Sequence, residues 1–208
     1  MDKAEGLNLY IVRHGETEWN VEKRFQGRKD SPLTELGKQQ AKQLGETLSG
    51  IQWEAVYVSP LGRCVDTAKI IVKNGQPIIL NEALQEMCFG NWEGQLHQEI
   101  IQTEPFKFEA FWQEPDHYIT SSGEDFYEVQ ERVIGELQKM IHKHPSGNVL
   151  IISHTVVIKI LMAYFDDRSI EALWNPPSIK PASLCQVAIL NGGKSEILLY
   201  GHVGRNHE

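Results

Sequence analysis

Short, continuously apolar runs recur along the chain with helical patterns between them, and this alternation constrains the fold more than any other feature. The runs are Leu7 to Val12, Ala55 to Val58, Pro77 to Leu80 and Val149 to Ile152. Strands without polar alternation are typical of parallel sheets buried on both faces. Helical spacing predicts helices over Thr34 to Ser49, Leu61 to Val72 and Glu124 to Lys143. The pattern predicts an α/β fold, a three-layer sandwich around a mainly parallel central sheet.

Two details complete the expected architecture. The β-like runs Cys185 to Leu190 and Glu196 to Tyr200 are joined by Asn191-Gly192-Gly193, which predicts a hairpin that adds an antiparallel edge strand. In the first predicted helix, one side is expected to be buried, and it carries Leu36, Ala41, Leu44 and Leu48.

Chemically active side chains follow the predicted strands at the points where the strands end. Arg13 and His14 follow the first strand, Arg63 opens the helix after the second, Glu86 comes soon after the third, and His154 follows the fourth. Taken singly, each could be an ordinary surface or boundary residue. Open parallel sheets, however, bind ligands outside the carboxyl ends of their strands. We therefore expect these side chains to converge on one edge.

An arginine beside a histidine, released from a buried strand into a glycine turn, is typical of a phosphate site. The guanidinium of Arg13 offers a fixed pair of donors to phosphoryl oxygens. A neutral imidazole at His14 can attack phosphorus and form a phosphohistidine. The first turn of the helix that carries Arg63 adds an anion-favouring helix N-terminus.

Composition sets the class of protein. The 208 residues make one large domain, residues 1 to 208, or a domain with a sizeable insertion, and no apolar run approaches a membrane span. Because no secretory signal is visible, a cytoplasmic location is expected. A net charge of −8 without a Lys/Arg run argues against nucleic acid as a partner. Three scattered cysteines, Cys64, Cys88 and Cys185, are expected to be reduced, with no disulfide framework or structural zinc.

Ordered blocks along nearly the whole chain resemble the histidine phosphatase superfamily, the clan of cofactor-dependent phosphoglycerate mutases and acid phosphatases. The first block is Arg13-His14-Gly15-Glu16-Thr17 with Asn20, continued by Gln26-Gly27 and Asp30-Ser31-Pro32-Leu33-Thr34. Later blocks contain Ser59, Leu61, Arg63, Thr67, Ala68, Leu84, Glu86, Phe89-Gly90, Trp92, Glu93-Gly94, Gly123-Glu124, Val129, Arg132 and Ser153-His154.

The resemblance implies a role for each matching residue. His14 is the expected nucleophile and Glu86 the expected general acid and base. The expected phosphate ligands are Arg13, Asn20, Gln26, Arg63, His154 and Thr155. Thr155 stands where a glycine is common in this block. No metal and no cofactor are implied; the expected partners are a small phosphomonoester substrate and inorganic phosphate as product.

Rival residues remain for some of these roles. Glu82 and Glu93 lie close to Glu86 in sequence, and only the spacing to Phe89-Gly90 favours Glu86. The other histidines, including His97, lack the strand-end setting. His142 and His144 end a predicted helix, where a terminal cation is favoured over a metal site.

The region after the third strand bears on the substrate. From Glu82 to Glu131 the only Lys or Arg is Lys107, against twelve Asp and Glu, whereas aromatic residues are frequent. A helical insertion over residues 90 to 122 is expected above the active site. Most aromatics can be explained by packing, but some are expected to line an apolar pocket, and the candidates are Trp19, Phe25, Trp92, Phe111 and Trp112.

This balance favours hydrolysis of varied, partly apolar phosphomonoesters, because a phosphoglycerate mutase needs further cations for its substrate. Two stretches, Phe108 to Pro115 and Leu173 to Pro177, resemble the bacterial broad-specificity phosphatases in particular. The alternatives are a phosphatase specific for phosphoserine or α-ribazole phosphate, a true mutase, or a phospho-ligand binding protein without activity. Exposed apolar area could support a homodimer, but the sequence does not decide it.

Overall fold

A computed structural model describes residues 6–72, 76–190 and 192–202. One six-stranded sheet runs through it in the order β3-β2-β4-β1-β5-β6. The strands are β1 (Gly6–Arg13), β2 (Ala55–Val58), β3 (Ile79–Leu80), β4 (Gly147–Ser153), β5 (Leu184–Leu190) and β6 (Ser195–His202). β1, β2, β3 and β4 are parallel, whereas β5 pairs antiparallel with both β1 and β6. The predicted mainly parallel sheet with an antiparallel edge is confirmed.

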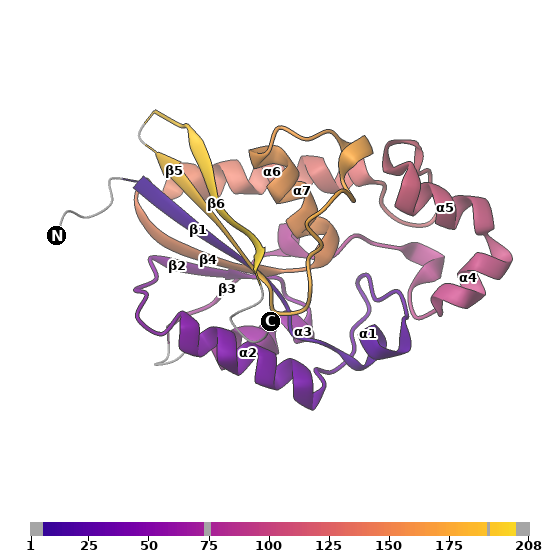
Figure 1. Cartoon of the computed structure of the whole chain (residues 1–208), viewed down its shortest axis with the longest axis horizontal. Coiled ribbons are helices and arrows are strands. Elements are labelled where there is room, and N and C mark those ends of the chain that lie inside the picture. The colour runs from indigo at the N-terminus through magenta and orange to yellow at the C-terminus, as the bar shows by residue number, and fades with distance from the viewer. Residues whose placement is uncertain (1–5, 73–75, 191, 203–208) are drawn as a thin grey trace.

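Helices cover both faces of the sheet (Figure 1). On one face lie α2 (Glu35–Thr47) and α3 (Gly62–Ile71), and on the other lie α6 (Phe126–Lys143) and α7 (Thr155–Phe165). The strands serve both layers because successive residues point to opposite faces. In β1, Leu9 and Ile11 join the core beneath α6 and α7, and Val12 joins the core against α2 and α3.

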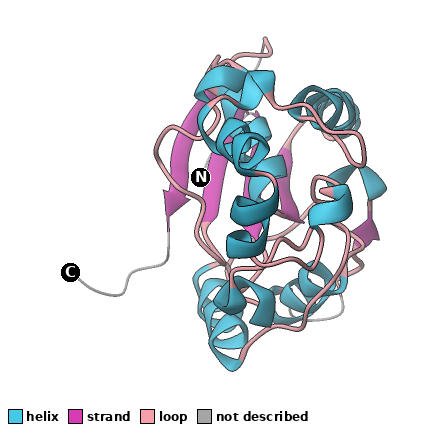
Figure 2. Ribbon diagram, turned by 90° about the vertical axis from the view of Figure 1, so that its right-hand side faces the viewer, coloured by secondary structure: helices cyan, strands magenta, loops and turns pink. Residues whose placement is uncertain are grey.

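The remaining short helices gather beyond the carboxyl ends of the parallel strands (Figure 1). They are α1 (Glu18–Glu22), η1 (Glu82–Leu84), η2 (Gly90–Trp92), α4 (His97–Thr103), α5 (Pro105–Gln113), η3 (Pro115–His117) and η4 (Ile170–Ala172). Figure 2, turned so that this side faces the viewer, shows helices and loops in front of the strands. Helices are present over residues 90 to 122, at the edge where open parallel sheets generally bind ligands.

Two expectations about local structure need correction, and one helix was not predicted. Leu36 is 51 % exposed, because Gly37 occupies the buried side of the first turn of α2 against the backbone of Glu16, and neighbouring helix positions are about 100° apart. The third strand is only two residues long and excludes Pro77. The helix α7 has no amphipathic pattern that would predict it, because every residue from Val156 to Ala163 is buried.

The expected hairpin is confirmed. The hairpin strands pair antiparallel, although Asn191 of the predicted turn lies outside the described residues. All three cysteines are unpaired. Within the described ranges, no helix is both long and apolar enough to span a bilayer.

Candidate active site

A pocket of about 210 Å³ lies at the carboxyl ends of β1 and β4. Its lining brings together side chains from across the chain, namely Arg13, His14, Asn20, Arg24, Phe25, Gln26, Gly27, Arg63, Glu86, Phe89, His97, Phe111, Trp112, Thr155, Val156 and Trp174. Three arginines and one glutamate give this pocket an excess of positive charge inside a chain whose net charge is −8.

His14 is held rigidly at the end of β1. Its backbone N–H donates to Ser153 O (3.0 Å), and its carbonyl accepts from Ala182 N–H (3.1 Å). The next residue must be glycine, because a Cβ on Gly15 would lie 2.5 Å from the carbonyl oxygen of Gly37. That close contact lets α2 pack directly beside the histidine loop.

The His14 ring has one nitrogen committed and one available. Nδ1 lies 2.7 Å from Gly15 O, and since a carbonyl can only accept, Nδ1 carries the proton. Burial lowers the pKa of His14 well below 6.5, with Arg63 and Arg13 adding to the effect and the bond to Gly15 opposing it. The imidazole is therefore neutral at pH 7, with its lone pair on Nε2.

Two arginines, the buried Arg63 and the half-buried Arg13, lie beside the histidine with part of their hydrogen-bonding capacity unused. Arg13 Nη1 donates to Ile179 O (2.7 Å), and Arg63 donates to Lys29 O, Gly27 O and Asp30 Oδ1 at 2.7–2.9 Å. Their Nε atoms are buried without a partner, as is Gln26 Oε1. Burial lowers the pKa of Arg13 to about 10, with Arg63 contributing, so the guanidinium stays charged at neutral pH. Unsatisfied buried groups of this kind are costly and call for a ligand.

Glu86 faces the pocket from the segment after η1. Its carboxylate accepts from Met87 N–H (2.9 Å) and Val156 N–H (3.4 Å), the latter in the first turn of α7. Burial raises its pKa, against the opposing effects of these amides and of Arg63 and Arg13. Glu82 is exposed, and Glu93 accepts from the backbone of Arg28 and Phe89. Of the three rival carboxylates, only Glu86 lines the pocket.

The Glu86 segment is fixed by α6. Arg132 donates to Ala83 O (2.8 Å) and Glu86 O (3.3 Å), and it is itself held by Glu124. Glu124 in turn accepts from Cys88 N–H (2.8 Å). These contacts give Glu124 and Arg132 a structural part in the site.

His154 lies behind His14 and does not line the pocket. Its side chain is fully buried, its ring centroid is 5.3 Å from that of His14, and Nε2 is 2.7 Å from Ser59 Oγ. Burial, followed by Arg63 and His14, lowers its pKa well below 6.5. His154 is therefore a neutral imidazole at pH 7, a hydrogen-bonding group and not a cation.

The apolar wall of the pocket differs from the predicted one. Phe25, Phe111 and Trp112 line it as expected, but Trp92 does not, because it is fully buried in the core and donates to Glu104 Oε1 (2.9 Å). Trp19, half-buried in α1, also lies outside the lining.

Sequence reasoning missed several lining residues, chiefly Arg24, Phe89, His97 and Trp174. None of them follows a strand, so the strand-end argument could not find them. Arg24 supplies a cation at the mouth, where it donates to Gly94 O (2.8 Å). The cation count over residues 82 to 131 overlooked it because Arg24 arrives from the segment after α1.

No group of three or more His, Cys, Asp or Glu is placed to hold a metal ion within the ranges that the structure describes. His144, a predicted helix-terminal residue, caps α6 and contacts the Tyr57 hydroxyl through Nε2 (2.9 Å).

Comparison with known proteins decides the family. The model of the histidine phosphatase superfamily (branch 1) matches residues 9–201. The chain belongs to this superfamily. A solved structure of this fold, Bacillus stearothermophilus YhfR, superposes with a TM-score of 0.92 at 42 % identity and covers 95 % of this chain and 98 % of its own.

Two curated relatives match over 170 residues each. The adenosylcobalamin/alpha-ribazole phosphatase of Escherichia coli is 31 % identical, covering 81 % of this chain and 84 % of the relative. Phosphoserine phosphatase 1 of Hydrogenobacter thermophilus is 32 % identical, covering 81 % of each. The family resemblance predicted from the sequence is confirmed.

Proposed function

We propose that this protein is a phosphomonoester hydrolase of broad specificity that works through a phosphohistidine on His14. The observation that carries the proposal is the arrangement around His14: a neutral imidazole with its lone pair on Nε2, beside Arg13 and Arg63, whose buried Nε atoms have no partner. A phosphoryl group would satisfy those nitrogens and present phosphorus to the nucleophile. The names of the related phosphatases agree with this chemistry.

Binding would place the phosphoryl oxygens among the unpaired donors. Arg13 and Arg63 supply charge, and the N-terminus of α7 at Thr155 supplies a dipole. Gln26 would donate through its Nε2 amide group, because its Oε1 can only accept. Asn20 Oδ1 accepts from Thr17 N–H (3.1 Å), so its amide NH₂ is the end that can donate to phosphate. His154 does not line the pocket, so it would support His14 from behind as a neutral partner without binding phosphate itself.

In the first half-reaction, Nε2 of His14 attacks phosphorus and the bond to the ester oxygen breaks. Glu86 gives its proton to that oxygen, and the alcohol leaves. The raised pKa of Glu86 favours the protonated carboxyl that this step needs. The arginines stabilise charge that develops on the transferred group.

In the second half-reaction, water attacks the phosphohistidine while Glu86 takes one of its protons. The phosphorus–nitrogen bond breaks, inorganic phosphate leaves, and His14 returns to its neutral form. Atoms and protons balance over the two steps, and no metal ion or cofactor is required.

The rest of the substrate would lie against aromatic side chains. Phe25, Phe111, Trp112 and Trp174 offer apolar surface without a dense set of directional groups, which favours varied apolar alcohols over one polar metabolite. The segment over residues 90 to 122 supplies Phe111 and Trp112, so we propose that it shapes the pocket.

A second candidate function rests on Arg24. A guanidinium at the pocket mouth could pair with a substrate carboxylate, as in phosphoserine or phosphoglycerate. In the structure, Arg24 also pairs with Glu22, which reduces its availability to a substrate.

Steady-state hydrolysis of a substrate panel in EDTA tests these proposals. The panel contains p-nitrophenyl phosphate, naphthyl phosphate, phosphoserine, 3-phosphoglycerate and α-ribazole phosphate, with wild type and His14→Ala assayed side by side. Broad specificity predicts release of phosphate from several esters and its loss in His14→Ala. One strongly preferred ester would replace broad by narrow specificity. Interconversion of 3- and 2-phosphoglycerate without net release of phosphate would contradict the hydrolase, and binding without turnover would indicate a non-catalytic protein.

A further inference from the structure

The segment from Trp174 to Ser183, between η4 and β5, contacts the candidate site at several points. The Trp174 side chain lines the pocket and donates through Nε1 to Phe111 O (2.6 Å). The carbonyl of Ile179 accepts from Arg13 Nη1 (2.7 Å), and the N–H of Ala182 donates to His14 O (3.1 Å). The position of this segment therefore sets the direction of the Arg13 guanidinium and the place of one pocket wall.

Two cations, Lys159 and Arg168, hold that segment by its carbonyl oxygens. Lys159 Nζ donates to Asn175 O (2.6 Å) and Pro177 O (3.3 Å). Arg168 Nη1 donates to Asn175 O (3.1 Å) and Pro176 O (3.2 Å). Three consecutive carbonyls are thus gathered between the two side chains.

Lys159 is an unusual residue for its position. It is 2 % exposed and lies in the middle of α7, whose residues from Val156 to Ala163 are all buried and otherwise apolar. Burying an ammonium costs free energy that a methionine or leucine at the same position would not. The two carbonyl contacts offset that cost only where the segment keeps its observed course.

We propose that Lys159 is a positioning residue of the active site, which acts through the Trp174–Ser183 segment to orient Arg13 and the Trp174 wall. The inference rests on the proposed function, since it takes Arg13 to bind the phosphoryl group of the substrate.

The charged surroundings of Lys159 make the effect depend on pH. Its ammonium faces Arg168 and Asp166 beyond α7, Cys185 on β5, and the ring of Tyr200 on β6 at 5.8 Å. Burial, followed by Arg168, lowers the pKa of Lys159 to about 8, against the opposing effects of Cys185 and Asp166. As the pH rises through about 8 the charge is lost and the hold on the carbonyls weakens. Phosphate binding is therefore expected to weaken on the alkaline side.

The test compares Lys159→Met, Lys159→Arg and wild type with p-nitrophenyl phosphate and with orthovanadate as a phosphate mimic. This ester is chosen because its leaving group needs no proton from Glu86, so the titration of Glu86 does not obscure that of Lys159. In Lys159→Met we expect KM and the inhibition constant of vanadate to rise about tenfold, with kcat changed less than about threefold. In Lys159→Arg both constants stay within about threefold of wild type at pH 7, and the rise in KM near pH 8 disappears, because arginine does not titrate there.

Tyr200→Phe is the matched control, because the Tyr200 ring lies 5.8 Å from Lys159 Nζ and its buried hydroxyl has no hydrogen-bond partner. It is expected to keep the wild-type KM and pH profile. A fall in kcat with KM unchanged in Lys159→Met would indicate a merely structural role and overturn the inference. If Lys159→Met does not fold, Lys159→Arg decides, and an unaltered alkaline limb in that variant overturns the inference. Hydrolysis that survives in His14→Ala would instead overturn the proposed function itself.

Discussion

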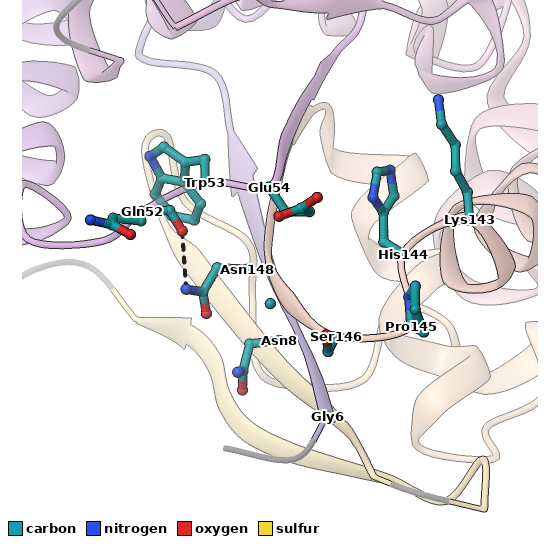
Figure 3. Close-up of a pocket in the computed structure, with 11 residues that line it drawn as sticks. Gly6, Asn8, Gln52, Trp53, Glu54, Lys143, His144, Pro145, Ser146 and Asn148 are labelled. Carbon is teal, nitrogen blue, oxygen red and sulfur yellow. Dashed lines mark hydrogen bonds between the residues drawn. The ribbon is translucent and has the colours of Figure 1, made fainter. Parts of the chain in front are cut away.

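The two ends of the sheet carry hollows of opposite character. At the amino end, a hollow of about 520 Å³ lies between the start of β4, the end of α6 and the loop before β2, and Figure 3 shows its polar lining. The candidate active site at the carboxyl end holds only about 210 Å³. By volume alone, the amino-end hollow would be preferred to the carboxyl-end pocket as the functional site.

The hydrogen bonds instead favour the carboxyl-end pocket as the functional site. In the amino-end hollow, the His144 ring contacts the Tyr57 hydroxyl at 2.9 Å. The Asn148 amide donates to Gln52 O at 3.1 Å, as Figure 3 shows. None of the unpartnered buried side-chain atoms found in the described ranges belongs to its lining residues, whereas Arg13, Gln26 and Arg63 each contribute one to the other pocket. The gathering of three unpaired buried polar atoms in one pocket, more than its volume, favours this end as the ligand site.

The largest expected difference between the two ends is the effect of replacing their histidines. His14→Ala is expected to lower kcat/KM for p-nitrophenyl phosphate by at least about a thousandfold, because the nucleophile is lost. The matched change at the amino end, His144→Ala, is expected to stay within about twofold. Steady-state assays of the two purified variants check this. Equal losses in both would mean that the two ends do not differ in function.

The cations give the next largest contrast. Arg63→Met removes a buried charge beside His14 and is expected to lower kcat/KM by between about 100-fold and 1000-fold. Lys143→Met, in the amino-end hollow, changes an exposed side chain and is expected to leave kcat/KM within about twofold. Inhibition by orthovanadate should weaken in the first variant alone. An Arg63→Met enzyme with wild-type vanadate affinity would remove Arg63 from the phosphate clamp.

For the carboxylates Glu86 and Glu54, the expected difference in hydrolysis rate depends on the leaving group of the substrate. Glu86→Gln is expected to slow hydrolysis of alkyl phosphates such as phosphoserine by roughly a hundredfold, because their alcohol needs a proton. With p-nitrophenyl phosphate the first half-reaction should slow far less, which rapid-quench measurement of alcohol release would show. Glu54→Gln, in the amino-end hollow, serves as control. A loss that is uniform across leaving groups would contradict the acid role.

The smallest expected effect is on stability. Burial raises the pKa of Glu86 in the folded state above its ordinary value of 4.5, so between these two pKa values the folded chain binds more protons than the unfolded chain. The free energy of unfolding therefore falls as the pH rises through that window, and the cost persists above it. Glu86→Gln is expected to raise Tm at pH 7 by roughly 2–4 °C, and the gain should vanish below pH 4.5. Calorimetry measures this gain in Tm, with Glu54→Gln as the control. An unchanged or lower Tm in Glu86→Gln at pH 7 would contradict the prediction.

The elements predicted best are those with strong local patterns. The run from Ala55 to Val58 forms β2 with the predicted bounds, because a strand buried on both faces needs four consecutive apolar residues. The same logic fails for α7, since a helix buried on nearly all sides has no amphipathic period. The amphipathic pattern of α2 also misplaced Leu36, which is exposed because Gly37 packs closely against the backbone of Glu16.

The sequence by itself determined the α/β alternation and the strand ends that carry Arg13, His14, Arg63 and Glu86, because the topology of a parallel sheet brings its carboxyl ends together. Only the tertiary structure decided the rest. In the folded chain, Glu86 is the buried carboxylate that lines the pocket, and His154 lies behind His14. Three further lining residues, Arg24, His97 and Trp174, come from distant segments. Loops and short helices meet through packing that no local period records, so their contacts appear only once the chain has folded.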